Sequence, residues 1–364
     1  MTTMRAVTLL DRKLQVKTVP APVPQSGEVL VRTLATGICG SDLHAISDGP
    51  ELVESMREVT GVDMMDVTRP VILGHEFCAE VLEYGPGTNG QLATGTRVVS
   101  FPMLLRPEPT LIGFGGVETP GGYGELMVLS EALLLPVPDN LSTDLAALTE
   151  PIAVALHAVN RAGLGSDEVP LVIGCGPIGL AIIAVLKMRG IGPIVAADFS
   201  PRRRERAADL GAAVVVDPRE TSPYDAWQQV AATDDPDRFG RQTLMFQGLP
   251  YRPSVVFECT GVPGVLQQIL SGAAAGSKVV VAGVCMEEDR FQPVSGLTKE
   301  IDVIFSFFYS IDEYVQTLNH LAAEELQVAP MITGKVGLDG VEQAVLDLGD
   351  PERHAKILID PSIR

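Results

Sequence analysis

The sequence predicts an α/β protein with a mostly β region at its start, followed by a parallel sheet covered by helices. Up to residue 145, short apolar runs such as 28–33 and 96–100 are separated by Gly and Pro. After residue 150, apolar runs alternate with helix-like segments, a pattern typical of a sheet buried on both faces. A chain of 364 residues is long enough for two such domains.

Several elements of the second region follow from this pattern. Apolar strands are expected at 169–174, 194–198, 254–258 and 278–282. Helices are expected at 177–189 and 202–210, and Gly211 ends the second one. Because both faces of such strands are buried, the sheet is expected to be doubly wound, with helices on each side.

The composition excludes several classes of protein. Hydrophobic residues make up 46% of the chain, charged residues 20%, and the formal net charge is −19. An acidic surface of this kind disfavours nucleic acid and anionic membranes as partners, and no apolar run of 18 residues is present to span a bilayer. The five cysteines show no short paired spacing and the first residues lack the apolar core of a secretory signal, so a cytoplasmic location is expected.

A phosphate-binding motif follows the first strand of the second region. The glycines of a G-x-G-x-x-G pattern are Gly174, Gly176 and Gly179, with Pro177 and Ile178 between the last two. In this context the first glycine permits a tight turn, the second lets the backbone approach a pyrophosphate, and the third lets helix and strand pack closely. The free N–H groups of the helix start would bind the phosphates. We therefore expect a Rossmann dinucleotide site here.

The residue type after the second strand bears on the choice of cofactor. Asp198 lies 19 positions after Gly179 and can accept hydrogen bonds from the ribose hydroxyls of NAD. Its charge would repel a 2′-phosphate, which favours NAD over NADP. The arginines 202–204, and Arg203 in particular, could pair with that phosphate or could form a solvated helix start, so NADP remains the alternative.

Three residues after later strands are also expected to contact the cofactor. They are Thr260, Gly283 and Val284. Each follows the carboxyl end of a predicted strand, where open parallel sheets bind their ligands.

A set of metal-binding side chains is divided between distant parts of the chain. Cys39, the pair His75 and Glu76, and Glu150 supply a thiol, an imidazole and carboxylates, which are ligands suited to zinc. An isolated cysteine is more often a buried structural residue. The glycine before His75 and the Glu-Pro pair at 150–151 favour a metal site instead.

Read together, these stretches resemble one family, the zinc-dependent medium-chain dehydrogenases/reductases, which include the alcohol and polyol dehydrogenases. The matching stretches run almost from end to end, at 37–44, 70–76, 121–125, 150–151, 174–179 and 354–359. The resemblance implies a GroES-like, mostly β catalytic domain at 1–150 and 305–364. It also implies a Rossmann NAD-binding domain at 151–304, and the Glu-Pro pair is more similar to the polyol and threonine dehydrogenase branch.

The resemblance implies roles for the residues of the predicted metal site. Cys39 and His75 would bind a catalytic zinc, and Glu150 stands where relatives carry a third ligand. Relatives use the carboxylate at the position of Glu76 as a direct or alternate ligand. Asp42 would orient the His75 imidazole through its second nitrogen.

The resemblance also implies a proton relay beside the metal. Ser41 would accept the alcohol proton, and His44 would pass it to solvent. An imidazole suits this step because its ordinary pKa, near ~6.5, lies close to neutral pH.

Two features depart from the family pattern. The stretch 101–122 contains no cysteine, so one catalytic zinc and no structural zinc are expected; its apolar side chains predict loop packing or a subunit contact. The separation of 36 positions between Cys39 and His75 is also longer than usual.

The additional length is an insert at 45–70. An apolar residue recurs at helical spacing at Leu52, Val53, Met56 and Val59. Gly61 follows as a helix stop. We favour a surface helix that packs one apolar face, and the alternative is a lid or wall over the substrate pocket.

The sequence thus predicts a zinc-dependent oxidoreductase that transfers a hydride between an alcohol and NAD. The alcohol would be a secondary alcohol or a polyol, with a bulky or apolar group as one option. The alternatives are a metal-free quinone or enoyl reductase of the same superfamily and a non-catalytic NAD-binding protein on this fold. Relatives are oligomers, so a homodimer or homotetramer is expected.

Overall fold

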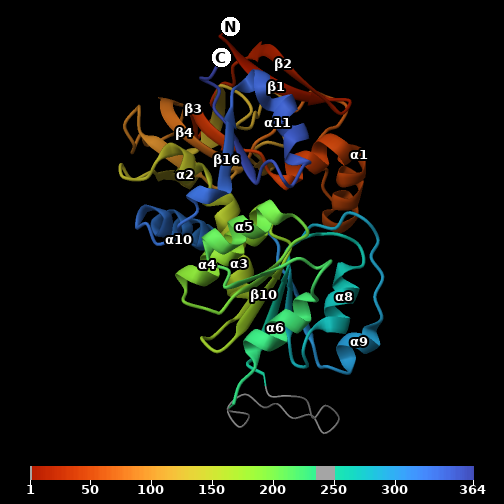
Figure 1. Cartoon of the computed structure of the whole chain (residues 1–364). Coiled ribbons are helices and arrows are strands. Elements are labelled where there is room, and N and C mark those ends of the chain that lie inside the picture. Colours follow the sequence, from red (N-terminus) through yellow and green to blue (C-terminus); the bar gives the residue numbers. More distant parts are fainter. Residues whose placement is uncertain (1, 235–250) are drawn as a thin grey trace.

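The computed structural model describes residues 2–234 and 251–364 and contains a large sheet in each half of the molecule. Figure 1 shows one sheet in the upper half, where both chain termini lie, and the other sheet in the lower half, with helices around it. The predicted class, a mostly β part and a parallel sheet covered by helices, is confirmed.

The upper sheet is mostly antiparallel and has seven strands among the described residues. Its order is β16-β17-β3-β4-β5-β9, and β8 pairs with β3. The strands are β3 (Glu28–Gly37), β4 (Glu76–Tyr84), β5 (Arg97–Ser100), β8 (Leu126–Ser130), β9 (Leu134–Pro136), β16 (Ile332–Val336) and β17 (Lys356–Ile359). Two separate ribbons pair β1 (Thr3–Leu10) with β2 (Lys13–Pro20) and β6 (Met103–Leu104) with β7 (Thr110–Leu111).

The last strand of the chain returns to this first sheet. β17 runs antiparallel to β3, with Leu358 opposite Gly37, and parallel to β16. A catalytic domain made of 1–150 and 305–364 requires such a return. The domain boundaries themselves stay a prediction.

The lower sheet is parallel throughout, with the order β12-β11-β10-β13-β14-β15. Its strands are β10 (Val169–Ile173), β11 (Val195–Ala197), β12 (Val214–Val216), β13 (Ser254–Glu258), β14 (Lys278–Val281) and β15 (Asp302–Phe305). The order reverses between β10 and β13, which places a ligand-binding crevice at the carboxyl ends of these two strands. All four strands expected in this region are present.

Helices connect and cover the strands. The described α-helices are α1 (Gly40–Thr60), α2 (Thr143–Ala147), α3 (Thr149–Ala162), α4 (Pro177–Met188), α5 (Pro201–Leu210), α6 (Pro223–Ala231), α8 (Val265–Gly272), α9 (Pro293–Leu297), α10 (Ile311–Ala322) and α11 (Val341–Leu348). Single 3₁₀ turns lie at Glu131–Leu133, Ala329–Met331 and Leu338–Gly340. The two predicted helices are α4 and α5, each within one residue of its expected bounds.

The insert predicted to be helical is the second part of α1. The helix is interrupted at Asp48, whose φ of −132° and ψ of 35° are not helical, and it ends at Gly61, which has a φ of 74°. Leu52 and Val53 are buried in the upper core, as a surface helix requires. Val59 was expected on the same face but is 84% exposed, because it lies in the last turn, beyond the part of the helix that contacts the core.

The predicted loop packing at 101–122 is confirmed for most of its large apolar residues. Leu104, Ile112 and Phe114 are buried, while Leu105 is 54% exposed. Apolar packing therefore holds this segment against the cores of the upper half.

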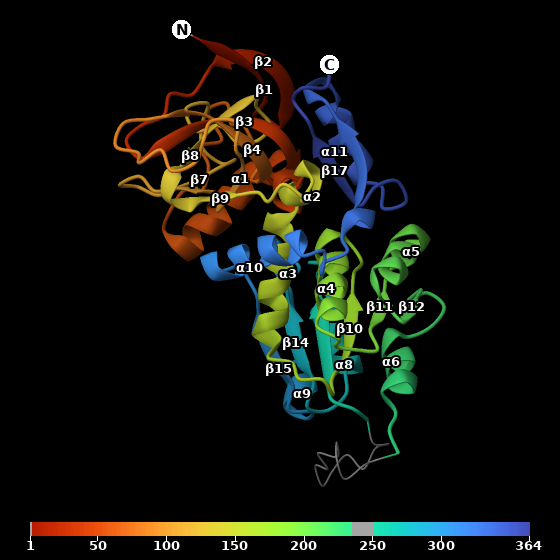
Figure 2. The ribbon, with the colours of Figure 1, turned by 90° about the vertical axis from the view of Figure 1, so that its left-hand side faces the viewer.

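A polar network at the surface of the core links α3 to α10. Glu313 accepts hydrogen bonds from His157 Nδ1 (2.9 Å), from Asn160 Nδ2 (2.6 Å) and from the N–H of Ser310 (2.8 Å). His157 is partly exposed and Asn160 is exposed. Figure 2 shows α3 running from the upper half into the lower half, with α10 across it. The network thus orients the helix that carries Glu150 in its first turn.

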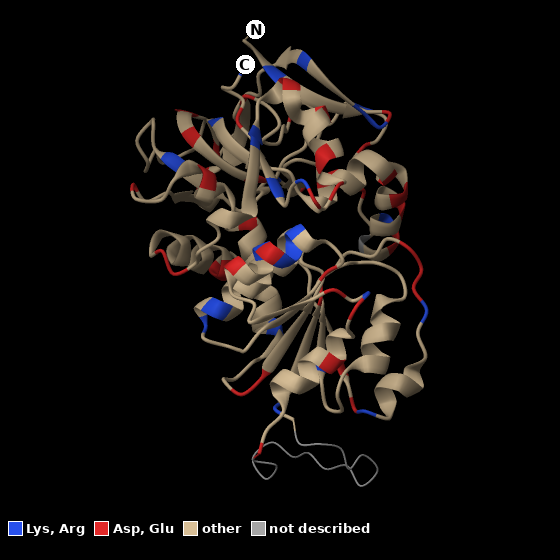
Figure 3. Ribbon diagram, in the orientation of Figure 1, with Lys and Arg blue, Asp and Glu red and all other residues tan. Residues whose placement is uncertain are grey.

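Acidic side chains are spread over both halves of the molecule, and basic ones gather on α5 near the centre (Figure 3). Within the described residues, no helix combines the length and the apolar character needed to cross a membrane.

Candidate metal and nucleotide site

The start of α1 fixes the position of Cys39. The Cys39 side chain accepts a hydrogen bond from the backbone N–H of Asp42, and Asp42 Oδ2 accepts one from the N–H of Cys39 at 3.0 Å. Such reciprocal capping is usually made by Ser or Thr. The sulfur therefore lies at the positive end of the α1 dipole, in a fixed orientation.

His75, which immediately precedes β4, lies against this cap. Burial alone would lower the pKa of His75, but the charge of Asp42 and the hydrogen bond and charge of Cys39 raise it well above the ordinary value. The ring stacks on Phe114 with 5.4 Å between centroids. His75 Nε2 lies 3.3 Å from Ser41 Oγ. Three of the predicted site residues therefore meet around His75.

Asp42 is fully buried and faces the other nitrogen of His75. Its Oδ1 lies 3.6 Å from His75 Nδ1, and neither atom has a hydrogen-bond partner. Its Oδ2 accepts from the hydroxyl of Tyr123 at 3.0 Å. Burial raises the pKa of Asp42, against the opposing charge of His75. A slight rotation of the imidazole would pair Nδ1 with Asp42 and leave Nε2 for a metal ion, which fits the predicted role of Asp42.

Glu76 has a different partner. Lys356 Nζ lies 2.7 and 2.8 Å from the two carboxylate oxygens of Glu76 and also donates to the carbonyl of Ile38 at 3.0 Å. Both side chains are almost completely buried. A side chain on Gly37 would collide with this carboxylate, because its Cβ would lie 1.9 Å from Glu76 Oε2. The structure thus places Glu76 in an ion pair.

Glu150 lies in the first turn of α3 and is 5% exposed. Burial raises its pKa to about 7, the charge of His75 opposes this, and the charge of Glu76 adds to it. The three residues are close enough to interact although they are distant in the sequence. Across residues 2–234 and 251–364, however, no three His, Cys, Asp or Glu side chains are already gathered at metal-binding distance.

Ser41 and His44 occupy the first two turns of α1 and are partly exposed. Residues three apart in a helix lie on one face. Ser41 lies beside His75, and His44 follows on the same side of α1.

The three glycines of the predicted phosphate-binding motif have separate steric requirements. Gly174 has a φ of 91°, a conformation that favours glycine. A Cβ on Gly179 would lie 1.9 Å from the carbonyl oxygen of Gly174, while a Cβ on Gly176 would meet nothing within 4 Å. Gly176 and Pro177 begin α4, and Ile178 follows, partly buried. Open space at Gly176 fits the close approach of a ligand.

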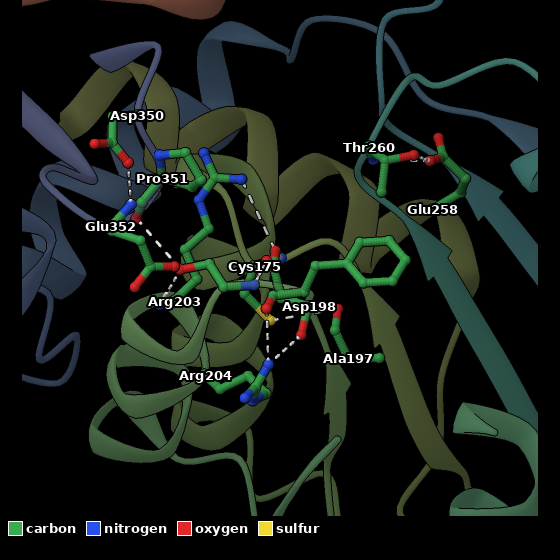
Figure 4. Close-up of polar contacts among 12 residues, drawn as sticks. Cys175, Ala197, Asp198, Arg203, Arg204, Glu258, Thr260, Asp350, Pro351 and Glu352 are labelled. Carbon is green, nitrogen blue, oxygen red and sulfur yellow. Dashed lines mark hydrogen bonds and ion pairs between the residues drawn. The ribbon is translucent and has the colours of Figure 1, made fainter. Parts of the chain in front are cut away.

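Asp198 braces this loop from the end of β11. Its Oδ2 accepts from the N–H of Cys175 at 2.8 Å and its Oδ1 from the N–H of Ser200 at 2.8 Å. Arg203 Nη1 lies 3.9 Å from Oδ2, and Arg204 Nη1 donates to the Asp198 carbonyl at 2.8 Å. Figure 4 shows these groups around Asp198, with Glu258 at the end of β13 and Thr260 in the turn that follows it. Of the arginine run, Arg203 alone reaches this carboxylate among the described contacts.

The turn after β13 closes the other side of the loop. Glu258 accepts from the N–H of Thr260 (2.7 Å) and of Gly261 (3.1 Å), and also from the Thr260 hydroxyl. The Thr260 methyl would lie 2.7 Å from a Cβ on Gly174, so the two turns are in contact. Gly283 donates its N–H to the Glu258 carbonyl at 2.9 Å, and Val284 is 55% exposed.

The sequence analysis missed three residues of these sites: Tyr123, Glu258 and Lys356. Glu258 ends a predicted strand and directly precedes Cys259 and Thr260, which was a usable signal. Tyr123 and Lys356 stood inside matched stretches, but only the fold shows that they contact Asp42 and Glu76.

The glycine geometry separates a folding requirement from a binding requirement. Gly179→Ala should lower the free energy of unfolding by about 1–3 kcal/mol, because the new methyl group would overlap the Gly174 carbonyl oxygen. Gly176→Ala should leave stability within about 0.5 kcal/mol of wild type and weaken dinucleotide binding. Denaturant unfolding and fluorescence titration with the reduced dinucleotide measure the two effects. Equal behaviour of the two variants would contradict this assignment.

Two family descriptions match the chain. An alcohol dehydrogenase GroES-like domain matches residues 25–139, and a zinc-binding dehydrogenase matches residues 177–324. The (R,R)-butanediol dehydrogenase of Bacillus subtilis (strain 168) is 31% identical over 363 residues, which cover 97% of this chain and 98% of that relative. The sorbitol dehydrogenase of the same strain is 27% identical over 350 residues, which cover 92% of this chain and 90% of that relative.

Solved structures agree with these matches. The crystal structure of 2R,3R-butanediol dehydrogenase from Bacillus subtilis has a TM-score of 0.80 at 30% identity. The match covers 99% of this chain and 100% of the chain in that structure. A zinc-binding dehydrogenase from Sinorhizobium meliloti 1021, bound to NADP, has a TM-score of 0.79 at 25% identity, with the same coverage.

The comparisons support an alcohol or polyol oxidoreductase that uses zinc and a nicotinamide cofactor, and they favour neither a metal-free reductase nor a non-catalytic protein. The chain belongs to the zinc-containing alcohol and polyol dehydrogenases of the medium-chain dehydrogenase/reductase superfamily.

Proposed function

We propose that the enzyme oxidises a secondary alcohol or a polyol with NAD and uses one zinc ion per chain, held by Cys39, His75 and Glu150. The observation that carries the proposal is the contact of Cys39 with buried His75, with Asp42 at the other ring nitrogen. Thiolate, imidazole and carboxylate are the donors that zinc prefers. When bound, zinc supplies a Lewis acid that eases deprotonation of the alcohol.

The charges around the two glutamates favour Glu150 over Glu76 as the third ligand. Lys356 already compensates the charge of Glu76 through both oxygens. Among the described residues, no lysine or arginine forms an ion pair with Glu150, although it is buried. The charges of His75 and Lys356 act on Glu150, but neither residue forms an ion pair with it among the described contacts. A buried carboxylate without a directly paired cation is costly. A cation shared with His75 would remove this cost.

Ser41 and His44 would carry the alcohol proton away. The Ser41 hydroxyl lies next to the ring nitrogen that we assign to the metal, so it is placed to accept the proton of a bound alcohol. His44, one turn further along α1, is partly exposed and can release the proton to water.

Two observations bear on the substrate class. The named relatives act on butanediol and on sorbitol, which supports a secondary alcohol with a neighbouring hydroxyl. Phe114 stacks on His75 and supplies an apolar wall beside the proposed metal position. We propose a diol or polyol that carries an apolar group toward Phe114.

For the cofactor we propose NAD. The Asp198 carboxylate is held in place by two backbone N–H groups and keeps further lone pairs for ribose hydroxyls. Arg203 lies at 3.9 Å and offsets part of that charge. The NADP found in the Sinorhizobium relative is the reason to test this choice directly.

Loss of the thiol tests the metal assignment. Cys39→Ser should lower the zinc content per chain and reduce alcohol oxidation by about 100-fold or more. Loss of a residue that only supports a metal ligand already costs about 10–100-fold in affinity or activity, and loss of a ligand itself should cost more. Binding of NADH should remain, because Cys39 lies outside the glycine loop. Cys285→Ser, at an exposed thiol, is the control and should retain both zinc and activity. A Cys39→Ser enzyme with most of its activity would refute the zinc site.

Removal of one charge tests the cofactor assignment. Asp198→Asn keeps an acceptor for a backbone N–H but removes the charge, so the kcat/KM ratio of NAD to NADP should fall at least about tenfold. Asp217→Asn is the control, because Asp217 follows the next strand, β12, and is ion-paired with Arg204 (3.0 Å) and Arg219 (2.6 Å). This control should change both cofactors equally, and an unchanged ratio in Asp198→Asn would exclude its role in selecting NAD.

We also propose that two chains associate through the edge of the lower sheet. β15 is an edge strand, and Val303, Phe305 and Phe307 are 39%, 67% and 74% exposed. An apolar sheet edge is a template for pairing with a second chain. Phe305→Glu should therefore lower the mass measured by size exclusion with light scattering, and Val59→Glu, at another exposed apolar residue, should not. A wild-type monomer would exclude the proposal.

A cytoplasmic location is proposed from the thiols. All five cysteines are free in the structure, as in proteins of a reducing compartment. Fractionation of cells that express a tagged chain tests this location.

A further inference from the structure

Lys356 is a buried lysine at the start of β17, and it lies beside the segment that carries Cys39. It is 1% exposed. β17 runs antiparallel to β3, and the N–H of Ile38 donates to the carbonyl of Ile357 at 3.1 Å, which continues this pairing one residue beyond β3. In the same register, Lys356 lies at the position opposite Cys39.

Three acceptors surround the ammonium group of Lys356. Its Nζ lies 2.7 and 2.8 Å from the two carboxylate oxygens of Glu76 and 3.0 Å from the carbonyl oxygen of Ile38. An ammonium group has three N–H donors, so these acceptors use all of them. Lys356 therefore keeps no donor for a substrate or a cofactor, and its contribution comes from the groups that it connects.

The two groups that Lys356 connects are chain neighbours of two proposed metal ligands. Ile38 directly precedes Cys39, and Glu76 directly follows His75. The ladder between β3 and β4 ends at Glu76, so both ligands lie just beyond the regular pairing of these strands. Lys356 thus joins the two segments at the point where the ladder ends.

Asp42 also links these segments, but less completely. Its Oδ2 accepts a hydrogen bond from the N–H of Cys39 at 3.0 Å. Its Oδ1 stands 3.6 Å from His75 Nδ1, and neither atom has a hydrogen-bond partner. Lys356, in contrast, has bonds of normal length to both segments.

Stability alone does not explain a buried lysine at this place. Removal of an ammonium group and a carboxylate from water is costly, and apolar side chains of similar volume often give an equal or higher free energy of unfolding. Lys335, which is also ion-paired, stays near the surface: its side chain is 34% exposed and lies 2.8 Å from Asp144 and 3.3 Å from Asp360. The burial of Lys356 with Glu76 therefore indicates a role in positioning.

We propose that Lys356 is a positioning residue for the zinc site. Its ammonium group ties the Ile38 carbonyl to the Glu76 carboxylate. This tie sets the separation of the ligands Cys39 and His75 before a metal ion binds. The proposal rests on the zinc function proposed above, and it goes beyond compensation of the charge of Glu76 because it requires the bond to Ile38 as well.

The test compares Lys356→Met with Lys335→Met, which removes an ion-paired ammonium group from the neighbouring strand β16. Each purified enzyme is titrated with a competing chelator to measure zinc affinity, and its cobalt(II)-substituted form is examined by visible absorption. Lys356→Met should bind zinc about 10–100-fold more weakly and shift the cobalt bands. Lys335→Met should match wild type in both measurements. Zinc affinity in Lys356→Met that equals or exceeds that of wild type overturns the inference.

A double variant separates positioning from charge compensation. Glu76→Gln combined with Lys356→Met removes both charges, so no unpaired ion is buried, and NADH binding and circular dichroism should show a folded chain. Its zinc affinity should still lie about 10–100-fold below that of wild type, because the tie is lost. Wild-type zinc affinity in the double variant would mean that the lysine only balances a charge, and it would overturn the inference while the zinc function stands.

The single variant Glu76→Gln excludes a direct role of this carboxylate as a ligand. Gln keeps an oxygen that accepts from Lys356, so the single variant should bind zinc more tightly than the double variant. An equal loss of zinc affinity in the two would identify Glu76 as a ligand and overturn the inference. A wild-type chain that holds zinc no better than Cys39→Ser would overturn both the inference and the zinc function.

Discussion

The upper site depends on the buried carboxylate of Asp42. Its Oδ2 accepts hydrogen bonds from the N–H of Cys39 and from the Tyr123 hydroxyl, and its Oδ1 faces His75. Three segments that are distant in the sequence are thereby joined to one side chain. Because a buried carboxylate needs several partners, each segment is held where it satisfies this group. The relative positions of the proposed thiol and imidazole ligands follow from that requirement.

The lower half uses carboxylates in the same way at the ends of strands. Asp198 and Glu258 both accept hydrogen bonds from backbone N–H groups of the turns beside them. Asp198 thereby fixes the glycine loop, Glu258 fixes the turn after β13, and the two turns are in contact at the switch point of the sheet. A loop that is already held in place loses less conformational entropy when it binds phosphates.

Much of the fold and part of the site were predictable from sequence. The strands and helices of the lower half follow from apolar runs and their breaks, and the glycine spacing has a direct steric basis at Gly179. Val59 was misplaced because helical spacing does not show where a helix leaves the core. Lys356 was missed because its role comes from a long-range contact, and no local pattern shows which lysine of a strand is a counter-ion.

The pairing of Lys356 with Glu76 has a consequence for folding. Lys356 belongs to β17, whereas Glu76 begins β4, 280 positions earlier in the sequence. Without β17 in place, the carboxylate beside the proposed ligand His75 lacks its counter-charge, and burying it alone is costly. The surroundings of His75 are therefore completed only when β17 has paired with β3, so this part of the upper half folds through a contact between distant segments.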